Sequence, residues 1–118
     1  MSDYKDLNVW KISIDFVENI YKIANNFPKE EVFGLSSQLK KAVISIPSNI
    51  AEGANRNTNK EFVQFLYIAL GSASEVETQL IIAKRLNFVN VIDDELENIM
   101  KIRKMLNALI RAMKNLKK

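Results

Sequence analysis

The apolar residues in the first part of the chain repeat with the spacing of an α-helix. They recur every three or four positions, which places them along one side of a helix. This stripe consists of Leu7, Trp10, Ile14, Val17, Tyr21 and Ala24. We therefore predict a first amphipathic helix over about residues 6–26.

A second apolar stripe runs along the same helix. It consists of Val9, Ile12, Phe16, Ile20, Ile23 and Phe27. Together the two stripes make more than half of the helix circumference apolar, whereas a helix of a small monomeric bundle needs only about a third to a half. The surplus favours a homo-oligomer in which Phe16 and Ile20 face a neighbouring subunit. The alternative is a wide core that takes up both stripes.

The next apolar pattern continues in helical phase through a proline. Its members are Leu35, Leu39, Ala42, Val43, Ile46, Ile50 and Ala54, and Pro47 lies among them. A proline removes one backbone N–H and crowds the carbonyl four residues earlier, so it kinks or ends a helix. We expect one helix that is kinked near Pro47 and continues past it. The alternative is a break, with Ser45 or Ser48 capping a new helix.

Capping signals delimit two further helices. Thr58 and Glu61 form a capping box, which predicts a third helix from about residue 59 to residue 86. Asp93 or Asp94 is expected to cap the fourth helix. The apolar stripe of that helix is Ile99, Ile102, Leu106, Leu109, Met113 and Leu116.

Four amphipathic helices with short connections predict the fold class. We expect an all-α protein, an antiparallel up-down-up-down four-helix bundle, with residues 1–118 forming a single domain.

The composition narrows the chemistry. The chain has no cysteine and no histidine, so it lacks thiolates, the commonest general base and the usual nitrogen ligand of zinc. We expect no enzymatic activity, no metal, no cofactor and no small-molecule substrate. No apolar run approaches the roughly 20 residues of a membrane span, and the first residues contain no apolar signal core. We expect no membrane association and a cytoplasmic location.

A polar face of the second helix is a candidate interface. It contains Ser45, Ser48, Asn49, Glu52 and Arg56, within about 100° of one another. Glu52 and Arg56 have the spacing of an i,i+4 ion pair, which is typical of a solvated face. Small polar residues also let another backbone approach closely. A solvated face and a subunit or partner interface therefore both stay open.

One carboxylate of the third helix lies on its apolar side. Glu77 projects near Leu70 and Ala73, and a carboxylate there needs a cationic or hydrogen-bonding partner. We expect a buried ion pair with Arg56, Lys41 or a neighbouring subunit. A lone carboxylate forms no acid–base pair, so a catalytic role is not expected.

Basic residues concentrate at the C-terminal end. Seven of the 17 basic residues lie in 98–118, which has no acidic residue, so the rest of the chain carries ten basic against 14 acidic residues. Those expected opposite the apolar stripe are Arg103, Lys104, Arg111, Lys114 and Lys118. Such a line suits a phosphate backbone, although solubilising helix faces look similar and no aromatic residue interleaves with it.

Three long stretches resemble the family of 23S rRNA intervening-sequence proteins. They read YKDLNVWKISIDFVENIY, FPKEEVFGLSSQLKKAVISIPSNIAEGANRNTNKEF and FLYIALGSASEVETQLIIAKRLNFV. The resemblance extends from Tyr4 to about Leu109, and SIPSNIAEG together with GSxxExETQL is its most specific part. More distantly, the chain is similar to the accessory variability proteins of diversity-generating retroelements. One departure is Asn55, where the family pattern usually has glycine.

The resemblance implies a small antiparallel four-helix bundle that assembles into a homopentamer. It also implies a ribosome-associated or other nucleic-acid-linked role, because the retroelement proteins are basic and bind nucleic acid. We therefore expect RNA or DNA as a partner of the basic face. The alternative is a protein-interaction module that binds no nucleic acid.

Overall fold

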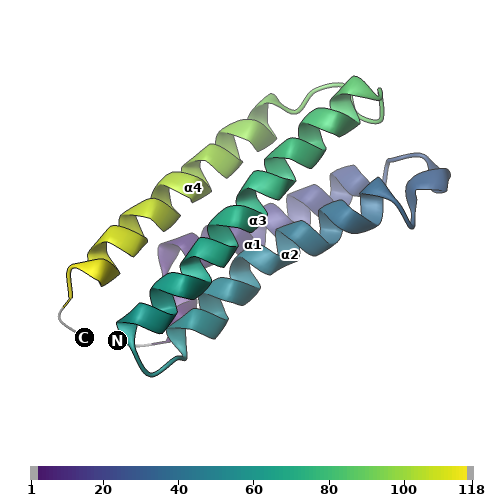
Figure 1. Cartoon of the computed structure of the whole chain (residues 1–118). Helices are drawn as coiled ribbons and strands as arrows, with labels where there is room; N and C mark the ends of the chain where they lie inside the picture. Colours follow the sequence, from purple (N-terminus) through teal and green to yellow (C-terminus); the bar gives the residue numbers. More distant parts are fainter. Residues whose placement is uncertain (1–2, 117–118) are drawn as a thin grey trace.

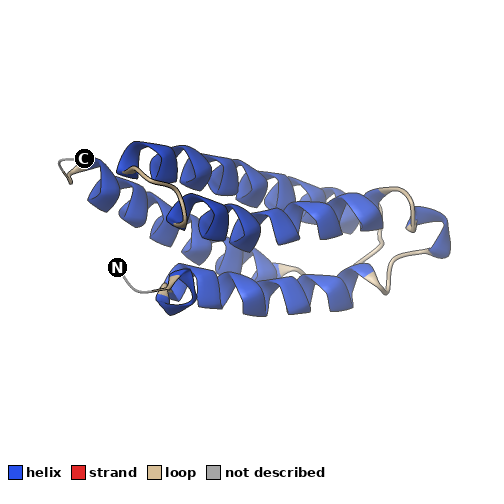
Figure 2. Ribbon diagram, turned by 90° about the horizontal axis from the view of Figure 1, so that it is seen from below, coloured by secondary structure: helices blue, strands red, loops and turns tan. Residues whose placement is uncertain are grey.

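Four long helices run alternately in opposite directions along the long axis of the molecule (Figure 1), and Figure 2 shows the same helices from below. The computed structural model describes residues 3–116. A 3₁₀ turn, η1 (Tyr4–Asp6), precedes α1 (Asn8–Ala24), and a second, η2 (Lys29–Glu31), precedes α2 (Leu35–Ala54). Two further helices follow, α3 (Asn59–Arg85) and α4 (Asp93–Lys114). Each helix packs on the next, and α1 also contacts α4. The predicted all-α antiparallel bundle is confirmed.

The helix ends agree in part with the capping signals. The Thr58 hydroxyl accepts a hydrogen bond from the Glu61 N–H at 3.1 Å, so the capping box at the start of α3 is confirmed. The predicted cap of α4 is wrong. Ile92 holds the cap position without a side-chain hydrogen bond, and Asp93 and Asp94 already lie in the first turn. Their charges still suit the positive end of the helix dipole.

The core takes the stripe of α1 that the sequence assigned to a neighbouring subunit. Phe16 and Ile20 are 2% and 0% exposed within a single chain. They cannot face a neighbour in this fold, so the expectation for these two residues is wrong. The stripe through Trp10, Ile14 and Val17 is the one left half-buried. The helix α1 therefore does carry apolar surface that the core leaves partly exposed. This surface belongs to the first stripe, whereas the second stripe was expected to be the exposed one.

The helix α2 continues through Pro47, as predicted, and the kink expected there stays a prediction. The side-chain amide of Asn49 donates to the carbonyl oxygen and to the hydroxyl of Ser45, both at 2.8 Å. These two bonds span the proline and tie together the turns on either side of it. They support the helix where Pro47 cannot donate a backbone hydrogen bond.

α2 and α3 approach each other closely at a glycine and a pair of serines. A Cβ on Gly53 would lie 2.7 Å from Phe65 Cβ and 3.2 Å from the Phe62 carbonyl oxygen. Further along, the hydroxyl of Ser72, a buried residue, donates to the hydroxyl of Ser45 at 2.8 Å. The small residues of α2 therefore serve a contact within the chain.

The substitution Gly53→Ala is expected to destabilise the bundle. The added methyl group meets a Cβ and a backbone carbonyl, neither of which can swing away. Overpacking typically costs about 1–3 kcal/mol, which outweighs the gain of about 1 kcal/mol from the higher helix propensity of alanine. Urea unfolding followed by circular dichroism measures the change.

The matched control is Gly71→Ala, in the middle of α3. A Cβ on Gly71 meets nothing within 4 Å, so only the propensity term applies, and we expect a gain of about 0.5–1 kcal/mol. Equal effects of the two substitutions would contradict the close approach at Gly53.

Candidate nucleic-acid interface

The outer face of α4 presents three exposed cations. Lys101, Lys104 and Arg111 are all exposed. The ion pairs found in residues 3–116 are Lys5–Asp3, Arg56–Glu52 and Arg103–Glu77, so none of these three cations belongs to one. We call Lys101, Lys104 and Arg111 the α4 basic face. Lys118, which was expected to extend this line, lies outside the described residues.

Arg103 does not belong to the α4 basic face. Its guanidinium forms a hydrogen-bonded ion pair with the Glu77 carboxylate of α3, and the two side chains are 39% and 29% exposed. Glu77 therefore does form an ion pair, but the pair is half-buried, so the predicted burial is wrong. Its partner is Arg103 instead of Arg56, Lys41 or a neighbouring subunit. Arg103 lies at the edge of α4 that faces α3, where the pair links the two helices.

Lys114 also turns toward α3. Its Nζ donates to the Tyr67 hydroxyl at 2.9 Å and lies 5.3 Å from the centroid of the Tyr67 ring. Tyr67 is 46% exposed. Sequence reasoning found no aromatic residue among the basic ones because it considered α4 alone. Tyr67 comes from the neighbouring helix, and only the antiparallel pairing of α3 with α4 places it beside Lys114.

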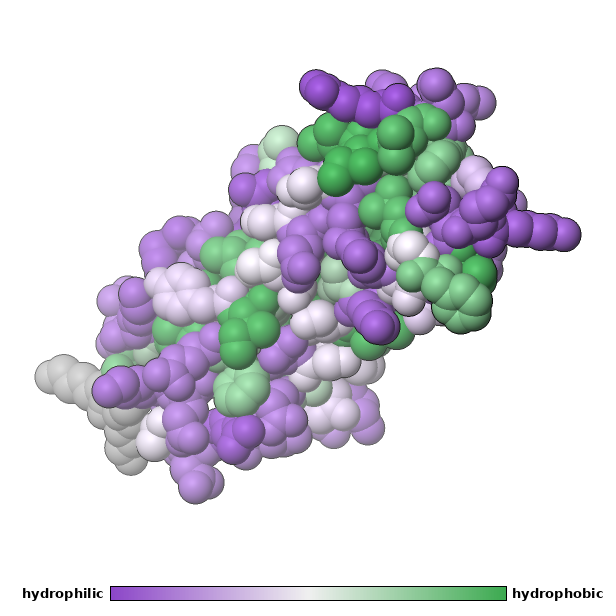
Figure 3. Space-filling view, turned by 45° about the vertical axis from the view of Figure 1, so that its right-hand side comes forward, coloured by the Kyte–Doolittle hydropathy of each residue, from purple (hydrophilic) through white to green (hydrophobic). Residues whose placement is uncertain are grey.

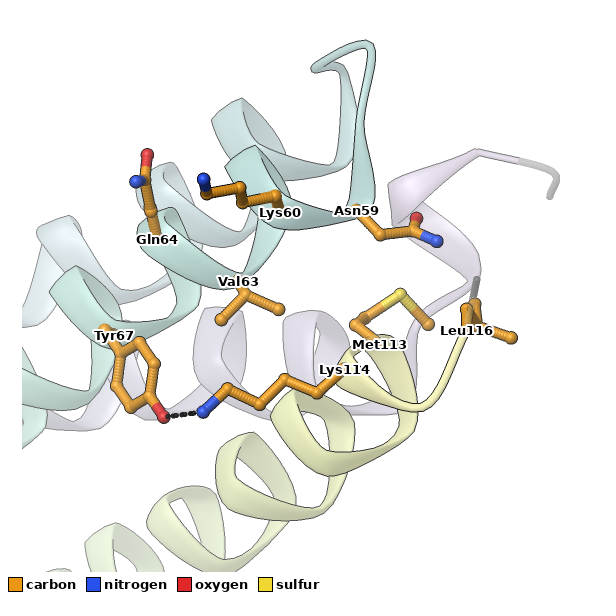
Figure 4. A pocket seen from close by; sticks show the side chains of 8 residues that line it. All are labelled: Asn59, Lys60, Val63, Gln64, Tyr67, Met113, Lys114 and Leu116. Carbon is orange, nitrogen blue, oxygen red and sulfur yellow. Dashed lines mark hydrogen bonds between the residues drawn. The ribbon is translucent and has the colours of Figure 1, made fainter. Parts of the chain in front are cut away.

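A groove of about 330 Å³ lies between the N-terminal part of α3 and the C-terminal end of α4 (Figure 4). We call it the α3–α4 groove. It is lined by Asn59, Lys60, Val63, Gln64, Tyr67, Met113, Lys114 and Leu116. Its lining combines two lysines, two amides and a phenol with three apolar side chains, and it includes no carboxylate.

The candidate interface on α2 divides between internal and exposed residues. Ser45 and Asn49 are half-buried and hydrogen-bonded inside the chain. Ser48, Glu52 and Arg56 are exposed. Glu52 and Arg56 form the i,i+4 ion pair at 2.8 Å, and the Arg56 guanidinium also lies 4.8 Å from the centroid of the Phe65 ring. A subunit or partner contact through these five residues stays a prediction.

A second groove, of about 300 Å³, lies where α1 and η1 meet α2. We call it the α1–α2 groove. Seven of its eight lining residues are apolar or aromatic, the exception being Ser48, and the set is Tyr4, Trp10, Ile14, Val17, Ile44, Pro47, Ser48 and Ala51. The half-buried stripe of α1 thus faces a groove rather than open solvent.

Apolar side chains also gather at the end of the bundle where α1 connects to α2 and α3 to α4. Figure 3 shows green apolar atoms concentrated at the upper right of the molecule. Large apolar residues exposed at this end include Val32 at 55%, Phe33 at 94%, Leu86 at 54% and Val91 at 68%. Exposed apolar patches of this kind mark interaction surfaces.

In the part of the chain that the structure covers, no group of three or more His, Cys, Asp or Glu side chains is placed to hold a metal ion. Among the same residues, no helix has both the length and the apolar character needed to cross a membrane.

The fold and its surfaces define a small antiparallel four-helix-bundle protein. The sequence model of the 23S rRNA-intervening sequence protein family matches residues 5–108. The chain belongs to this family, and the resemblance read from the sequence is confirmed.

One solved structure extends this comparison. It is a crystal structure of a protein of unknown function from the S23 ribosomal protein family of Bacteroides thetaiotaomicron VPI-5482. The two chains superpose with a TM-score of 0.78 at 27% sequence identity, and the match covers 86% of this chain and 97% of the other. Among curated proteins, no match to this chain is found.

Because Arg103 forms an ion pair with Glu77, we predict that Arg103 stabilises the fold. Arg103→Ala is expected to lower the free energy of unfolding, because it leaves the half-buried Glu77 carboxylate without its cation. A double-mutant cycle with Glu77→Ala, measured by urea unfolding, should give a coupling energy of about 0.5–1 kcal/mol, as befits a partly exposed pair.

Lys104→Ala is the matched control, one residue along α4. It removes a cation that is exposed and outside any ion pair of residues 3–116, and should change stability by less than about 0.5 kcal/mol. A coupling energy of zero between Arg103 and Glu77 would contradict the structural role.

Proposed function

We propose that this protein is a non-enzymatic, cytoplasmic bundle that self-associates and binds RNA or DNA through the α4 basic face. The observation that carries the proposal is the exposure of Lys101, Lys104 and Arg111 on a helix that has no acidic residue from position 98 onward. Cations in this arrangement neutralise phosphates and release counterions, which gives salt-sensitive and largely sequence-independent affinity.

The chain belongs to a family whose name refers to intervening sequences of 23S rRNA, and this membership supports a nucleic-acid partner. Ribosomal RNA is the first candidate ligand. The α4 basic face has few side chains for reading base edges, so the affinity it provides should depend on phosphate contacts and little on sequence.

Reversing two charges of the α4 basic face tests the proposal. In Lys104→Glu/Arg111→Glu, affinity for RNA and DNA of any sequence should fall, and the slope of log affinity against log salt should become shallower by about two. Fluorescence anisotropy with labelled oligonucleotides from ~50 mM salt upward measures both quantities.

The matched control is Lys29→Glu/Lys41→Glu, which makes the same change in net charge. Both lysines are exposed. They lie on η2 and α2, and in the described residues neither of these elements contacts α4. Equal loss in both double variants would show that only net charge matters. A wild type that binds neither RNA nor DNA at ~50 mM salt would contradict the proposal.

The chain is further proposed to form a homo-oligomer, a pentamer by the resemblance of its sequence. The α1–α2 groove supports this proposal, because its aromatic and aliphatic lining has the composition of an interface core. Ser48, one of the residues expected at a subunit contact, lies in this groove.

Ile14→Glu is expected to dissociate the oligomer and leave a folded monomer, because it places an unpaired carboxylate in the proposed contact. Multi-angle light scattering gives the mass, and circular dichroism reports the fold.

Phe16→Glu should instead abolish folding, since Phe16 is 2% exposed in one chain. Met100→Glu, at a 51% exposed position of α4, should leave the mass unchanged. A monomer mass for the wild type at micromolar concentration would end the oligomer proposal.

A protein-interaction module is the second candidate function. The observation that favours it is the group of exposed apolar residues Val32, Phe33, Leu86 and Val91 at one end of the bundle, in which Phe33 is 94% exposed. A phenylalanine in that position contributes apolar surface that the fold itself does not use. This candidate takes precedence if the wild type binds neither RNA nor DNA at low salt.

A further inference from the structure

We propose that the α3–α4 groove binds one unit of a single-stranded nucleic acid, with a base against the Tyr67 ring and a phosphate between Lys60 and Lys114. This inference rests on the proposed function. It goes further by assigning the strandedness of the ligand and by adding residues of α3 to the interface.

The groove has the charge that a phosphate requires. Lys60 of α3 and Lys114 of α4 lie on opposite sides of Val63 (Figure 4). No carboxylate is among the eight lining residues, so a bound anion meets no repulsion from the groove itself. The amides of Asn59 and Gln64 add donors and acceptors that suit a sugar or a base edge.

The groove also has an apolar part that a phosphate alone would not need. Val63 is buried, Met113 is half-buried and Leu116 is exposed, and the half-exposed Tyr67 ring adjoins them in the lining. A flat aromatic body that carries a negative charge matches this combination of ring, apolar floor and lysines. The volume of about 330 Å³ is at the lower end of sites for small ligands, which fits one nucleotide unit.

Lys114 lies at the hydroxyl end of the Tyr67 ring. Its ammonium lies 5.3 Å from the Tyr67 ring centroid and 2.9 Å from the hydroxyl. The lysine stem is flexible and carries a compact charge. It can therefore swing from the Tyr67 hydroxyl to the phosphate of a nucleotide whose base stacks on the ring. The contact seen in the free protein thus keeps the cation beside the aromatic platform.

A single strand fits these features better than a duplex. Bases of a duplex are stacked inside it and cannot reach an aromatic side chain, whereas unstacked bases of a single strand can. A duplex would contact the lysines and leave the apolar floor unused. Arg111 precedes Lys114 by one helical turn, so a strand leaving the groove can pass directly onto the α4 basic face.

The test compares three probes of the same length, about 12 nucleotides. They are a labelled single-stranded oligouridylate, a single strand of abasic sugar-phosphate, and an RNA duplex. The wild type should bind oligouridylate more tightly than the abasic strand. Tyr67→Ala should weaken oligouridylate binding by about 5- to 100-fold, to the level of the abasic strand, while abasic and duplex affinities stay unchanged.

Two further variants separate stacking from other effects. Tyr67→Phe keeps the ring and removes the hydroxyl that holds Lys114, so it should retain most of the affinity for oligouridylate. Ile68→Ala removes a 51% exposed apolar side chain at the next position, outside the groove, and should bind like the wild type. Thermal unfolding of each variant confirms that it is folded.

The outcomes distinguish this inference from the proposed function. Equal binding of the oligouridylate and abasic strands by the wild type, or unchanged binding by Tyr67→Ala, would contradict binding of a base in the α3–α4 groove. Either result would leave the proposal for the α4 basic face unaffected. Tighter binding of duplex than of single strand does the same. Binding of none of the probes at ~50 mM salt overturns both. Binding of an oligodeoxyuridylate as tightly as the RNA supports stacking without a contribution from the 2′-hydroxyl.

Discussion

The helices α2 and α3 pack against each other at a glycine and a pair of serines, and this packing positions α3. Gly53 leaves no room for a methyl group against Phe65 and Phe62, and the Ser72–Ser45 bond joins the same two helices through their hydroxyl groups. Interiors are close-packed and interfaces of this kind do not deform continuously. The position of α3 is therefore fixed by α2 before α4 is considered. Because α3 carries Glu77 and Tyr67, this contact also determines which cations of α4 are engaged within the fold.

The cations of α4 divide according to the side of the helix on which they lie. Arg103 and Lys114 lie on the edge beside α3 and contact Glu77 and Tyr67. The α4 basic face lies further round the helix, where residues 3–116 offer it no anionic partner. A charge count along the sequence treats all these residues alike. Their chemistry differs, because one group is partly desolvated against another helix and the other remains hydrated.

The sequence predicted the helices and the bundle because helical periodicity is a local property. It also predicted continuity through Pro47, since the apolar stripe keeps its phase there. It assigned the wrong stripe of α1 to the core because both stripes are apolar and periodicity alone does not rank them. Packing between the helices decides which stripe is buried. Phe16 and Ile20 fill the space between helices, whereas Trp10 lies at the edge of the core. The capping of α4 failed because the sequence rule considers residue type alone, whereas the helix begins early enough to place both aspartates in its first turn.

The features of the candidate site that sequence reasoning missed all depend on contacts between helices. Arg103 and Glu77 are 26 positions apart in sequence, and Lys114 and Tyr67 are 47 apart. No periodicity within one helix connects such residues. A heptad register for the antiparallel α3–α4 pair would have placed Tyr67 near the C-terminal end of α4. That register could have been derived from the two apolar stripes, so the signal was present, but only for an argument that treated the helices as a pair.

The helix dipole accounts for part of the charge pattern of α4 but not for all of it. Acids in the first turn and bases in the last turn stabilise a helix, and Asp93, Asp94, Arg111 and Lys114 occupy these turns. The effect falls off within one turn of each end. Lys101 and Lys104 lie more than two turns before Lys114, so the dipole gives no reason for cations there. Solubility does not require one sign of charge either, since mixed charges serve it as well. Exposed cations in the middle of a helix suit contact with a polyanion, which is the role proposed for the α4 basic face, and several copies in the proposed oligomer would add their individually weak contacts.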